Sequence, residues 1–315
     1  MPLYTQVPID DPNLHKQTEL TTATKEEYEN YFLPHPSNTF EKILRFILFF
    51  VTLGPLRMLL TILCFIVFIG TMAILNLFKN RFKTPREYKI WAQKILYPIA
   101  RLGMLSIGIV HIKKTGDIEP DTRTIVINHL TMFDIVVVIS LFDSSYLAMS
   151  SLKDFLFMRI ANEIFNMVYV DRTKAKQGTT EIIRKLQNDY SRVPIVIFPE
   201  GKVTNGDCLL GFRTGAFVND TPIQGMTFRY NLWFCSKGQS TIAWVDPNDL
   251  FYIWQLYTIP FITLEVNCLP QVSFKGSNKT PEEKAAEVEL TMANSLGCLA
   301  LKQTNKDYFI KHKQD

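Results

Sequence analysis

The feature that most constrains this chain is a run of apolar residues between positions 43 and 78. Only Arg45, Arg57 and the Gly54-Pro55 pair interrupt it, and the 18 residues 58–75 carry no charge. An apolar stretch of this length is sufficient for a helix to cross the hydrocarbon layer of a membrane. A buried core helix would have to be apolar on every side over about ten turns, which is unusual in a soluble domain. The run therefore predicts attachment to a membrane.

Two sequence signals divide this run into helices. Asn38 stands three residues before Glu41, which is the spacing of a capping box at a helix start. Gly54-Pro55 is expected to break or kink the apolar segment. Either a single tilted crossing or a re-entrant helical hairpin in one leaflet fits this pattern. A cleaved signal peptide does not fit, because a net acidic segment precedes the run and no small-residue cleavage site follows.

The cations that flank the run indicate its orientation. Lys25 and Lys42 lie on its N-terminal side, and more cations follow it: Lys79, Arg81, Lys83, Arg86, Lys89 and Lys94. Loops rich in lysine and arginine stay in the cytosol, so the bulk of the chain should face the cytosol. The sequons at Asn219 and Asn278 would then remain unglycosylated. Lys311 and Lys313 near the end resemble a dilysine retrieval signal of the endoplasmic reticulum, although a solvated basic tail explains them equally well.

Composition excludes several classes of protein. Hydrophobic residues make up 47% and charged residues 20%, which excludes a wholly disordered chain. Cationic and acidic side chains number 34 and 30 with no basic block, so we expect no nucleic-acid partner. The five cysteines lack metal-ligand or disulfide-framework spacing and are interpreted as reduced thiols. No feature of the sequence indicates an oligomeric state.

The remainder of the chain predicts an α/β domain. Short apolar strands at residues 124–128, 146–149, 167–170 and 193–198 alternate with helices at 132–142 and 181–189. We expect a mixed sheet flanked by helices, with an N-terminal transmembrane or re-entrant helical segment. The predicted parts are a polar tail without assigned structure (1–37), a membrane anchor (38–79), a juxtamembrane amphipathic helix (80–118), the catalytic core (119–275), and a C-terminal helix with a basic tail (276–315).

Three segments carry more specific expectations. The helix at residues 85–106 should have Trp91, Ile95, Leu96, Ile99 and Leu102 on its apolar side. The aromatic-rich segment 250–261 is interpreted either as an interfacial patch or as an ordinary core helix. A helix that begins after the Thr280 cap should continue toward residue 301.

Candidate catalytic residues lie where a strand ends. His129 follows a buried strand, and Asp134 stands five residues later at the start of the next helix. This spacing lets the carboxylate bind one imidazole nitrogen and leave the other as a general base. A helix-capping aspartate beside a packed histidine is the alternative. No serine or cysteine stands where a nucleophile would be expected, which favours direct transfer to a substrate hydroxyl.

Further polar groups follow other strands. Phe198-Pro-Glu200-Gly201 supplies a carboxylate and a turn, and Arg172 supplies a guanidinium suited to phosphate. Arg213 lies in a glycine-flanked loop, and Pro222 belongs to a Thr-Pro-Ile segment. Each of these groups could also be an ordinary turn or a salt bridge, but their joint order favours one site.

In that order the motifs resemble those of the glycerolipid acyltransferases that carry an HX4D motif. The four family motifs match His129 with Asp134, residues 169–172, residues 198–201 and residues 221–223. Residues 53–57, 200–205, 212–217, 228–230 and 242–244 are most similar to the lysophosphatidylcholine and lysophosphatidylethanolamine acyltransferases. The resemblance covers about residues 38–275.

This resemblance implies an acyl-CoA-dependent transfer of a fatty acyl group to a lysophospholipid hydroxyl. His129 would be the general base and Asp134 its orienter, while Arg172, Glu200 and Gly201 would hold the phosphate and glycerol of the acceptor. Acyl-CoA is a co-substrate, and neither a metal nor another cofactor is implied. Arg213 or Lys202 could meet the CoA phosphates.

Departures from the family pattern leave the acceptor open. Asn166 replaces a usual glycine, Tyr169 a phenylalanine, Lys202 a threonine or serine, and Gly225 a proline. The alternatives are an enzyme that acylates lysophosphatidic acid or glycerol 3-phosphate, and a non-catalytic membrane scaffold that retains the fold. The intact pair of His129 and Asp134 favours an enzyme.

Overall fold

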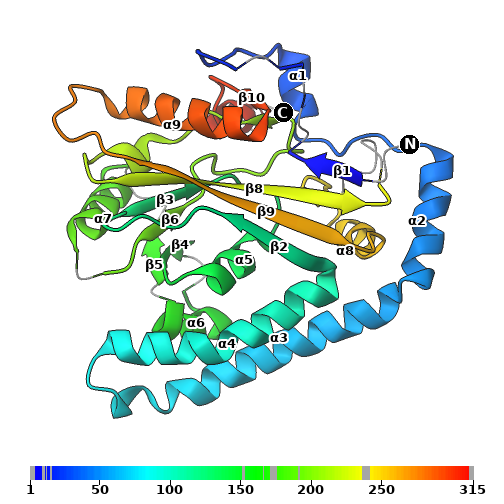
Figure 1. The fold of residues 1–315 in the computed structure, drawn as a ribbon, viewed down its shortest axis with the longest axis horizontal. Helices are drawn as coiled ribbons and strands as arrows, with labels where there is room; N and C mark the ends of the chain where they lie inside the picture. Colours follow the sequence, from blue (N-terminus) through cyan, green and yellow to red (C-terminus); the bar gives the residue numbers. More distant parts are fainter. Residues whose placement is uncertain are drawn as a thin grey trace.

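The structure is a computed structural model that describes residues 4–8, 11, 13–14, 16–150, 153–165, 167–170, 176–190, 192–235 and 242–311. Among these residues, eight strands form one mixed sheet with helices on both faces (Figure 1). The predicted α/β architecture is therefore confirmed.

The strands of the main sheet have the order β2-β9-β8-β3-β6-β4-β5, and β1 also pairs with β8. They are β1 (Tyr4–Val7), β2 (Ile109–Thr115), β3 (Thr124–Ile127), β4 (Ser145–Met149), β5 (Met167–Val170), β6 (Ile195–Ile197), β8 (Ile223–Trp233) and β9 (Ile262–Val272). A separate parallel pair consists of β7 (Cys208–Leu209) and β10 (Leu299–Ala300). Strand β3 runs parallel to β6 and β8, whereas β9 and β1 are antiparallel to β8. The parallel strands therefore end at a common edge.

The helices lie in two layers. They are α1 (Lys25–Asn30), α2 (Thr39–Val51), α3 (Gly54–Asn76), α4 (Pro85–Ile107), α5 (Asp134–Leu141), α6 (Leu156–Phe165), α7 (Lys176–Asn188), α8 (Asp249–Tyr257), α9 (Pro281–Leu296) and α10 (Asn305–Lys311), with 3-10 turns η1 (Lys79–Arg81) and η3 (Thr214–Phe217). In Figure 1, α9 lies above the sheet and α4 and α5 lie below it. Strand β3 serves both layers, because Ile125 packs into one core and Val126 packs into the other.

The apolar run forms two helices, as predicted. Asn38 and Glu41 make a complete capping box at the start of α2. That helix ends at Val51, and α3 begins at Gly54 after Leu53, whose φ is 55°. Among the described helices, α3 is the one that is long and apolar enough to cross a membrane, and only 17% of its most apolar stretch is buried.

The amphipathic helix α4 exists, but part of its predicted apolar side does not face the core. Leu96 is buried as expected, whereas Ile95 and Leu102 are exposed. The buried stripe includes Ala92 and Ala100. Helix α4 packs closely against α3, and its buried residues also include the larger Tyr88 and Met104.

The predicted N-terminal tail is not a structureless segment. Strand β1 pairs with β8, and α1 begins with a capping box formed by Thr24 and Glu27. Thr21 bridges to Leu301, so the described N-terminal residues pack on the C-terminal region. The sequence prediction missed these contacts because they join positions far apart in the chain.

The predicted limits of the core at residues 119 and 275, and the predicted end of the helix that follows Thr280, also differ from the structure. Strand β2 lies before position 119 but belongs to the main sheet, next to β9. Helix α9 packs on the sheet as part of the core rather than forming a separate C-terminal part. It ends at Leu296, because Gly297 adopts a left-handed conformation (φ 66°) that closes the helix.

The aromatic segment 250–261 combines both predicted interpretations. It forms most of α8, in which Tyr252 and Leu256 are buried. Leu250, Phe251 and Phe261 are exposed. One side of this segment is therefore core, and the other is an apolar surface.

Candidate active site

His129 and Asp134 meet at the edge of the sheet where β3 ends. The Nδ1 atom of His129 lies 2.8 Å from Asp134 Oδ2, and the aspartate is fully buried. The short turn between β3 and α5 brings the two side chains together, as the sequence spacing predicted. Histidine Nδ1–H donates to the carboxylate in this arrangement.

The Asp134 carboxylate has several other donors. Its Oδ2 atom also accepts hydrogen bonds from the backbone N–H groups of Leu130 (2.8 Å) and Thr131 (3.0 Å). Its Oδ1 atom accepts a bond from the hydroxyl of Tyr230. These donors compensate for the burial of a negative charge.

The outer side of the imidazole remains accessible. The His129 side chain is 20% exposed, and its ring stacks on Phe198 with centroids 4.4 Å apart. None of the described residues forms a hydrogen bond with Nε2 of His129. The ring is therefore fixed in orientation while this nitrogen is left for a substrate proton.

Glu200 supports the backbone of His129 rather than facing a substrate. Its Oε1 atom accepts the N–H of His129 at 3.0 Å, and its Oε2 atom accepts the N–H of Leu210 at 3.1 Å. The side chain is 1% exposed. Burial raises the pKa of Glu200 to about 7, against the opposing effect of the two backbone donors. The sequence analysis assigned Glu200 to acceptor binding, but this geometry favours a positioning role.

Gly201 and Arg213 lie close together in the loops around Glu200. Gly201 has a φ of 67°, and a Cβ atom there would lie 2.8 Å from Arg213 Nε. The Arg213 guanidinium donates to Asn305 Oδ1 at 3.0 and 2.9 Å. Arg213 therefore links the turn after Glu200 to the start of α10, a contact that its expected role with CoA did not anticipate.

Lys202 points toward two aromatic rings. Its ammonium lies 4.3 Å from the ring centre of Tyr308 and 5.3 Å from that of Phe32. Burial lowers the pKa of Lys202. This cation–π contact joins the motif loop to both terminal regions, whereas the sequence analysis considered Lys202 for the CoA phosphates.

Pro222 is not part of this cluster. Pro222 accepts the backbone N–H of Arg123 and precedes β8, which runs parallel to β3 with Ile223 opposite Thr124. It lies at the starting edge of the strands, so roughly 15–20 Å of strand separates it from His129. The structure therefore places Pro222 away from His129 and Asp134, and its role in substrate binding stays a prediction. Arg172 lies outside the described residues.

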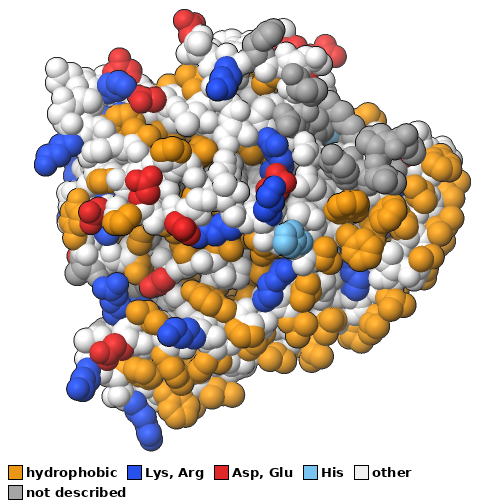
Figure 2. All heavy atoms as spheres, viewed as in Figure 1, with side chains coloured by type: hydrophobic (Ala, Val, Ile, Leu, Met, Phe, Trp, Pro, Cys, Tyr) orange, Lys and Arg blue, Asp and Glu red, His pale blue; other side chains and the backbone are white. Residues whose placement is uncertain are grey.

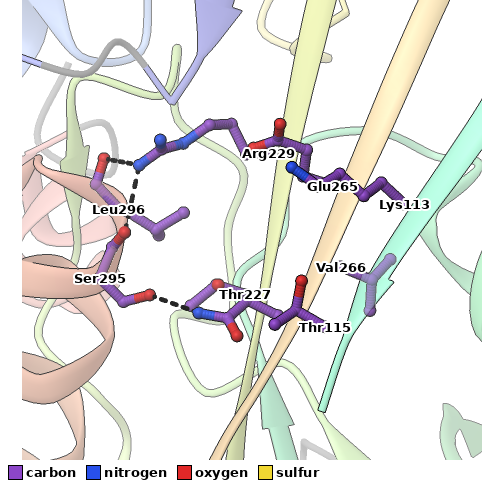
Figure 3. Close-up of a pocket in the computed structure, with 9 residues that line it drawn as sticks. Lys113, Thr115, Thr227, Arg229, Glu265, Val266, Ser295 and Leu296 are labelled. Atoms are coloured by element: carbon purple, nitrogen blue, oxygen red, sulfur yellow. Dashed lines mark hydrogen bonds between the residues drawn. The ribbon is translucent and has the colours of Figure 1, made fainter.

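A separate cavity of about 200 Å³ lies on the other face of β8. Figure 3 shows Arg229, Glu265 and Lys113 side by side on neighbouring strands. Arg229 donates to the carbonyl groups of Ser295 and Leu296 at the end of α9. Because alternate residues of a strand face opposite sides, Arg229 points away from the Tyr230 side of the sheet. We do not place the catalytic site in this cavity.

Comparison with protein families finds a match over the region that contains the candidate site residues. A family model described as acyltransferase matches residues 109–229. Its range includes His129, Asp134 and Glu200. Over residues 109–229 the chain is therefore similar to the acyltransferase family, and the relatives that it matches are lysophospholipid acyltransferases. The matched range begins at β2 and ends within β8, so it contains β3, β4, β5 and β6 and the first part of β8.

Relatives of this acyltransferase include plant and animal proteins. It is 33% identical over 133 residues to the lysophospholipid acyltransferase LPEAT1 of Arabidopsis thaliana, covering 40% of this chain and 33% of that protein. It is 31% identical over 140 residues to lysophosphatidylcholine acyltransferase 1 of Homo sapiens, covering 44% and 25%. A longer match, 28% identical over 227 residues, joins it to lysophosphatidylcholine acyltransferase 2 of Danio rerio and covers 68% and 41%. The matches span a third or less of the first two relatives.

A solved structure shares the fold of this acyltransferase. The 1-acyl-sn-glycerophosphate (LPA) acyltransferase PlsC from Thermotoga maritima superposes with a TM-score of 0.56 at 15% sequence identity. The alignment covers 77% of this chain and 95% of that chain. At this identity the likeness establishes the fold alone.

The sequence analysis missed several residues around the candidate dyad. Tyr230 was noted only for its family resemblance, and Phe198 only as part of a motif. Asn305 was not singled out. Asn128 was also missed; its side chain exchanges two hydrogen bonds with the backbone of Phe228 and holds the end of β3 against β8. Each partner lies in a different element, so no local pattern could identify it.

Proposed function

We propose that this acyltransferase moves a fatty acyl group from acyl-CoA to the free hydroxyl of a lysophospholipid, with His129 as the general base. The observation that carries the proposal is the 2.8 Å bond from His129 Nδ1 to the buried Asp134 carboxylate, which leaves Nε2 without a hydrogen bond to any of the described residues. The geometry suits proton abstraction from a hydroxyl, which is the step that an O-acyl transfer requires.

The proposed reaction proceeds by direct transfer. Nε2 of His129 takes the proton of the acceptor hydroxyl while the hydroxyl oxygen attacks the thioester carbonyl carbon. The carbon–sulfur bond then breaks, and the departing CoA thiolate receives the proton from His129. Asp134 stabilises the imidazolium that forms between these events. Stacking on Phe198 keeps the ring in place.

For the acceptor we propose lysophosphatidylcholine or lysophosphatidylethanolamine. The support is that the relatives of this chain include lysophosphatidylcholine acyltransferases. Lysophosphatidic acid is the alternative acceptor. A phosphate monoester calls for convergent cations, and the sequence offers fewer candidates than such a site requires.

We also propose that α3 lies in the plane of the membrane, inserted in one leaflet. Arg57 near its start donates to the carbonyl of Ile259, and Asn76 at its end donates to the carbonyl of Ile160. A perpendicular crossing would therefore draw the attached parts of the domain into the bilayer. Figure 2 shows hydrophobic side chains along the right and lower edges, where Figure 1 places α2, α3 and α4.

We propose that the domain faces the cytosol at the endoplasmic reticulum or a related endomembrane. The support is the excess of cations after the apolar run. Asn219 and Asn278 should then carry no glycan, and a mobility shift after glycosidase treatment would contradict this orientation. Lys313 of the candidate retrieval signal lies outside the described residues.

The decisive experiment measures acyl transfer in membranes that carry the protein, with labelled oleoyl-CoA and a panel of lysolipids. His129→Ala should lower the rate by roughly 10²–10⁴-fold, the usual contribution of a general base. His111→Ala is the matched control, because His111 is an exposed residue of β2 and should retain activity. Transfer to lysophosphatidic acid alone would reject the proposed acceptor. Absence of transfer to every acceptor would favour the scaffold alternative.

A further inference from the structure

The hydroxyl group of Tyr230 reaches the side of the Asp134 carboxylate that faces away from the histidine. It donates to Oδ1 at 2.5 Å, while Oδ2 holds His129 Nδ1 at 2.8 Å. Both Tyr230 and Asp134 are fully buried. The two carboxylate oxygens of Asp134 therefore bind different partners: Oδ2 binds the imidazole of His129, and Oδ1 binds the phenol of Tyr230.

The backbone of Tyr230 is held firmly on both sides. Tyr230 pairs with Val7 of β1 and with Leu264 of β9. This double pairing fixes the direction of the side chain, which crosses the core to α5. A short O–H···O bond to a buried carboxylate is of the charge-assisted kind, stronger than a bond between neutral groups.

We propose that Tyr230 is a positioning residue of the acyl-transfer site, holding Asp134 so that Oδ2 points at His129 and drawing part of its negative charge away from the imidazole. This inference rests on the proposed function of His129. The phenol donor competes with the imidazole for the carboxylate charge. Its removal therefore strengthens the attraction between Asp134 and protonated His129.

Five ionisable side chains lie in or beside this site: His129, Asp134, Tyr230, Glu200 and Tyr252. Asp134 contacts Tyr230 and His129, Glu200 contacts the backbone of His129, and Tyr252 contacts Thr131 at 2.8 Å between their hydroxyl oxygens. Glu200 is shared by the wild type and any Tyr230 variant, so its own titration cancels in a comparison. Tyr252 also donates to the carbonyl of Ile242 at 3.0 Å.

Tyr230→Phe tests the proposal, and Tyr252→Phe is its control. Both changes remove one hydroxyl from a buried tyrosine, but only the first removes a donor to Asp134. On the acidic limb we expect Tyr230→Phe to lower kcat by roughly 10–100-fold, because the loss of a hydrogen bond to the charged carboxylate leaves a larger fraction of His129 protonated and unable to act as a base. The acidic limb of its kcat profile should move to higher pH, because His129 would remain protonated over a wider range. Tyr252→Phe should retain the wild-type profile.

The proposal would be overturned if Tyr230→Phe and Tyr252→Phe lost kcat equally and the acidic limb of the kcat profile did not move. Tyr230 would then have only a structural role. A wild-type rate and profile for Tyr230→Phe would also overturn it. Failure of the proposed function is distinguishable, since the wild type would then transfer no acyl group. In that case an NMR titration of His129 in the detergent-solubilised protein decides: a higher pKa in Tyr230→Phe supports the positioning contact, and an unchanged pKa rejects it.

Discussion

The carboxylate of Glu200 accepts a hydrogen bond from the backbone N–H of His129 at 3.0 Å. A residue of the third sequence motif thus supports the main chain of the first motif. The other oxygen of Glu200 accepts the N–H of Leu210. This carboxylate therefore connects the end of β3 to the loop that leads out of β7.

Glu200 should make stability depend on pH. Burial raises its pKa from 4.5 to about 7, so the folded protein binds this proton more tightly than the unfolded chain. Its contribution is full below about pH 4.5 and is lost as pH rises through about 7, a change of order 3 kcal/mol. Glu200→Gln should flatten this part of the stability profile, measured by urea unfolding in detergent at several pH values.

Glu200→Ala provides the companion measurement. It leaves the N–H groups of His129 and Leu210 without their carboxylate partner, and each buried unpaired donor costs about 1–3 kcal/mol. Both stability and acyl transfer should fall. A pH profile of stability in Glu200→Gln that matches the wild type would contradict the buried-acid interpretation.

Gly201→Ala should destabilise the protein and reduce transfer. The new Cβ atom would lie 2.8 Å from both Arg213 Nε and Asn305 Nδ2, and the residue has a φ of 67°. The left-handed backbone alone costs an alanine about 1–2 kcal/mol.

The matched control is Gly178→Ala within α7, where a Cβ atom would meet nothing within 4 Å. It should raise stability by about 0.5–1 kcal/mol. Thermal unfolding of both variants checks the pair, and equal melting temperatures would refute the close packing around Gly201.

Arg57 should be required for the attachment of α3 to the domain. Its guanidinium donates to the carbonyl groups of Ser106 and Ile259, both at 3.1 Å, and so joins the ends of α4 and α8. Arg57→Met removes these donors and should cost at least about 2 kcal/mol. Arg86→Met, at an exposed position of α4, should cost little. Unfolding of both variants in the same detergent tests this prediction. Equal stabilities of the two variants would show that the Arg57 hydrogen bonds do not hold α3 on the domain.

The C-terminal end of α3 and the turn η1 that follows it should bind anionic membranes more tightly than neutral ones. Exposed Leu77 and Phe78 lie directly before Lys79, Arg81 and Lys83. Cations at the headgroup level contribute about 1 kcal/mol each to binding of an anionic surface. Reversing these three charges to glutamate should lower binding to vesicles of phosphatidylcholine with phosphatidylserine by more than about tenfold.

The control for this experiment reverses Lys25, Lys275 and Lys302, which are exposed but belong to other parts of the molecule. It should retain binding. Flotation of both variants with neutral and anionic vesicles, at low and high salt, provides the measurement. Equal binding of the wild type to neutral and anionic vesicles would refute the electrostatic preference and leave insertion of the apolar face intact.

The sequence by itself determined the features that depend on neighbouring residues. The capping box of Asn38, the helix break at Gly54-Pro55 and the pairing of His129 with Asp134 all involve residues a few positions apart. Local propensity and short turns decide such features, so their patterns can be recognised without the fold. The alternation of strands and helices also indicated the α/β class.

Only the tertiary structure decided the partners that lie far apart in the chain. Tyr230 meets Asp134 across 96 positions, and Arg213 meets Asn305 across 92. It also placed Pro222 away from His129 and Asp134, because parallel strands place residues before and after a strand at opposite edges. The physical reason is that a side chain's role depends on the direction in which its strand and register place it, and no short pattern encodes the register of distant strands.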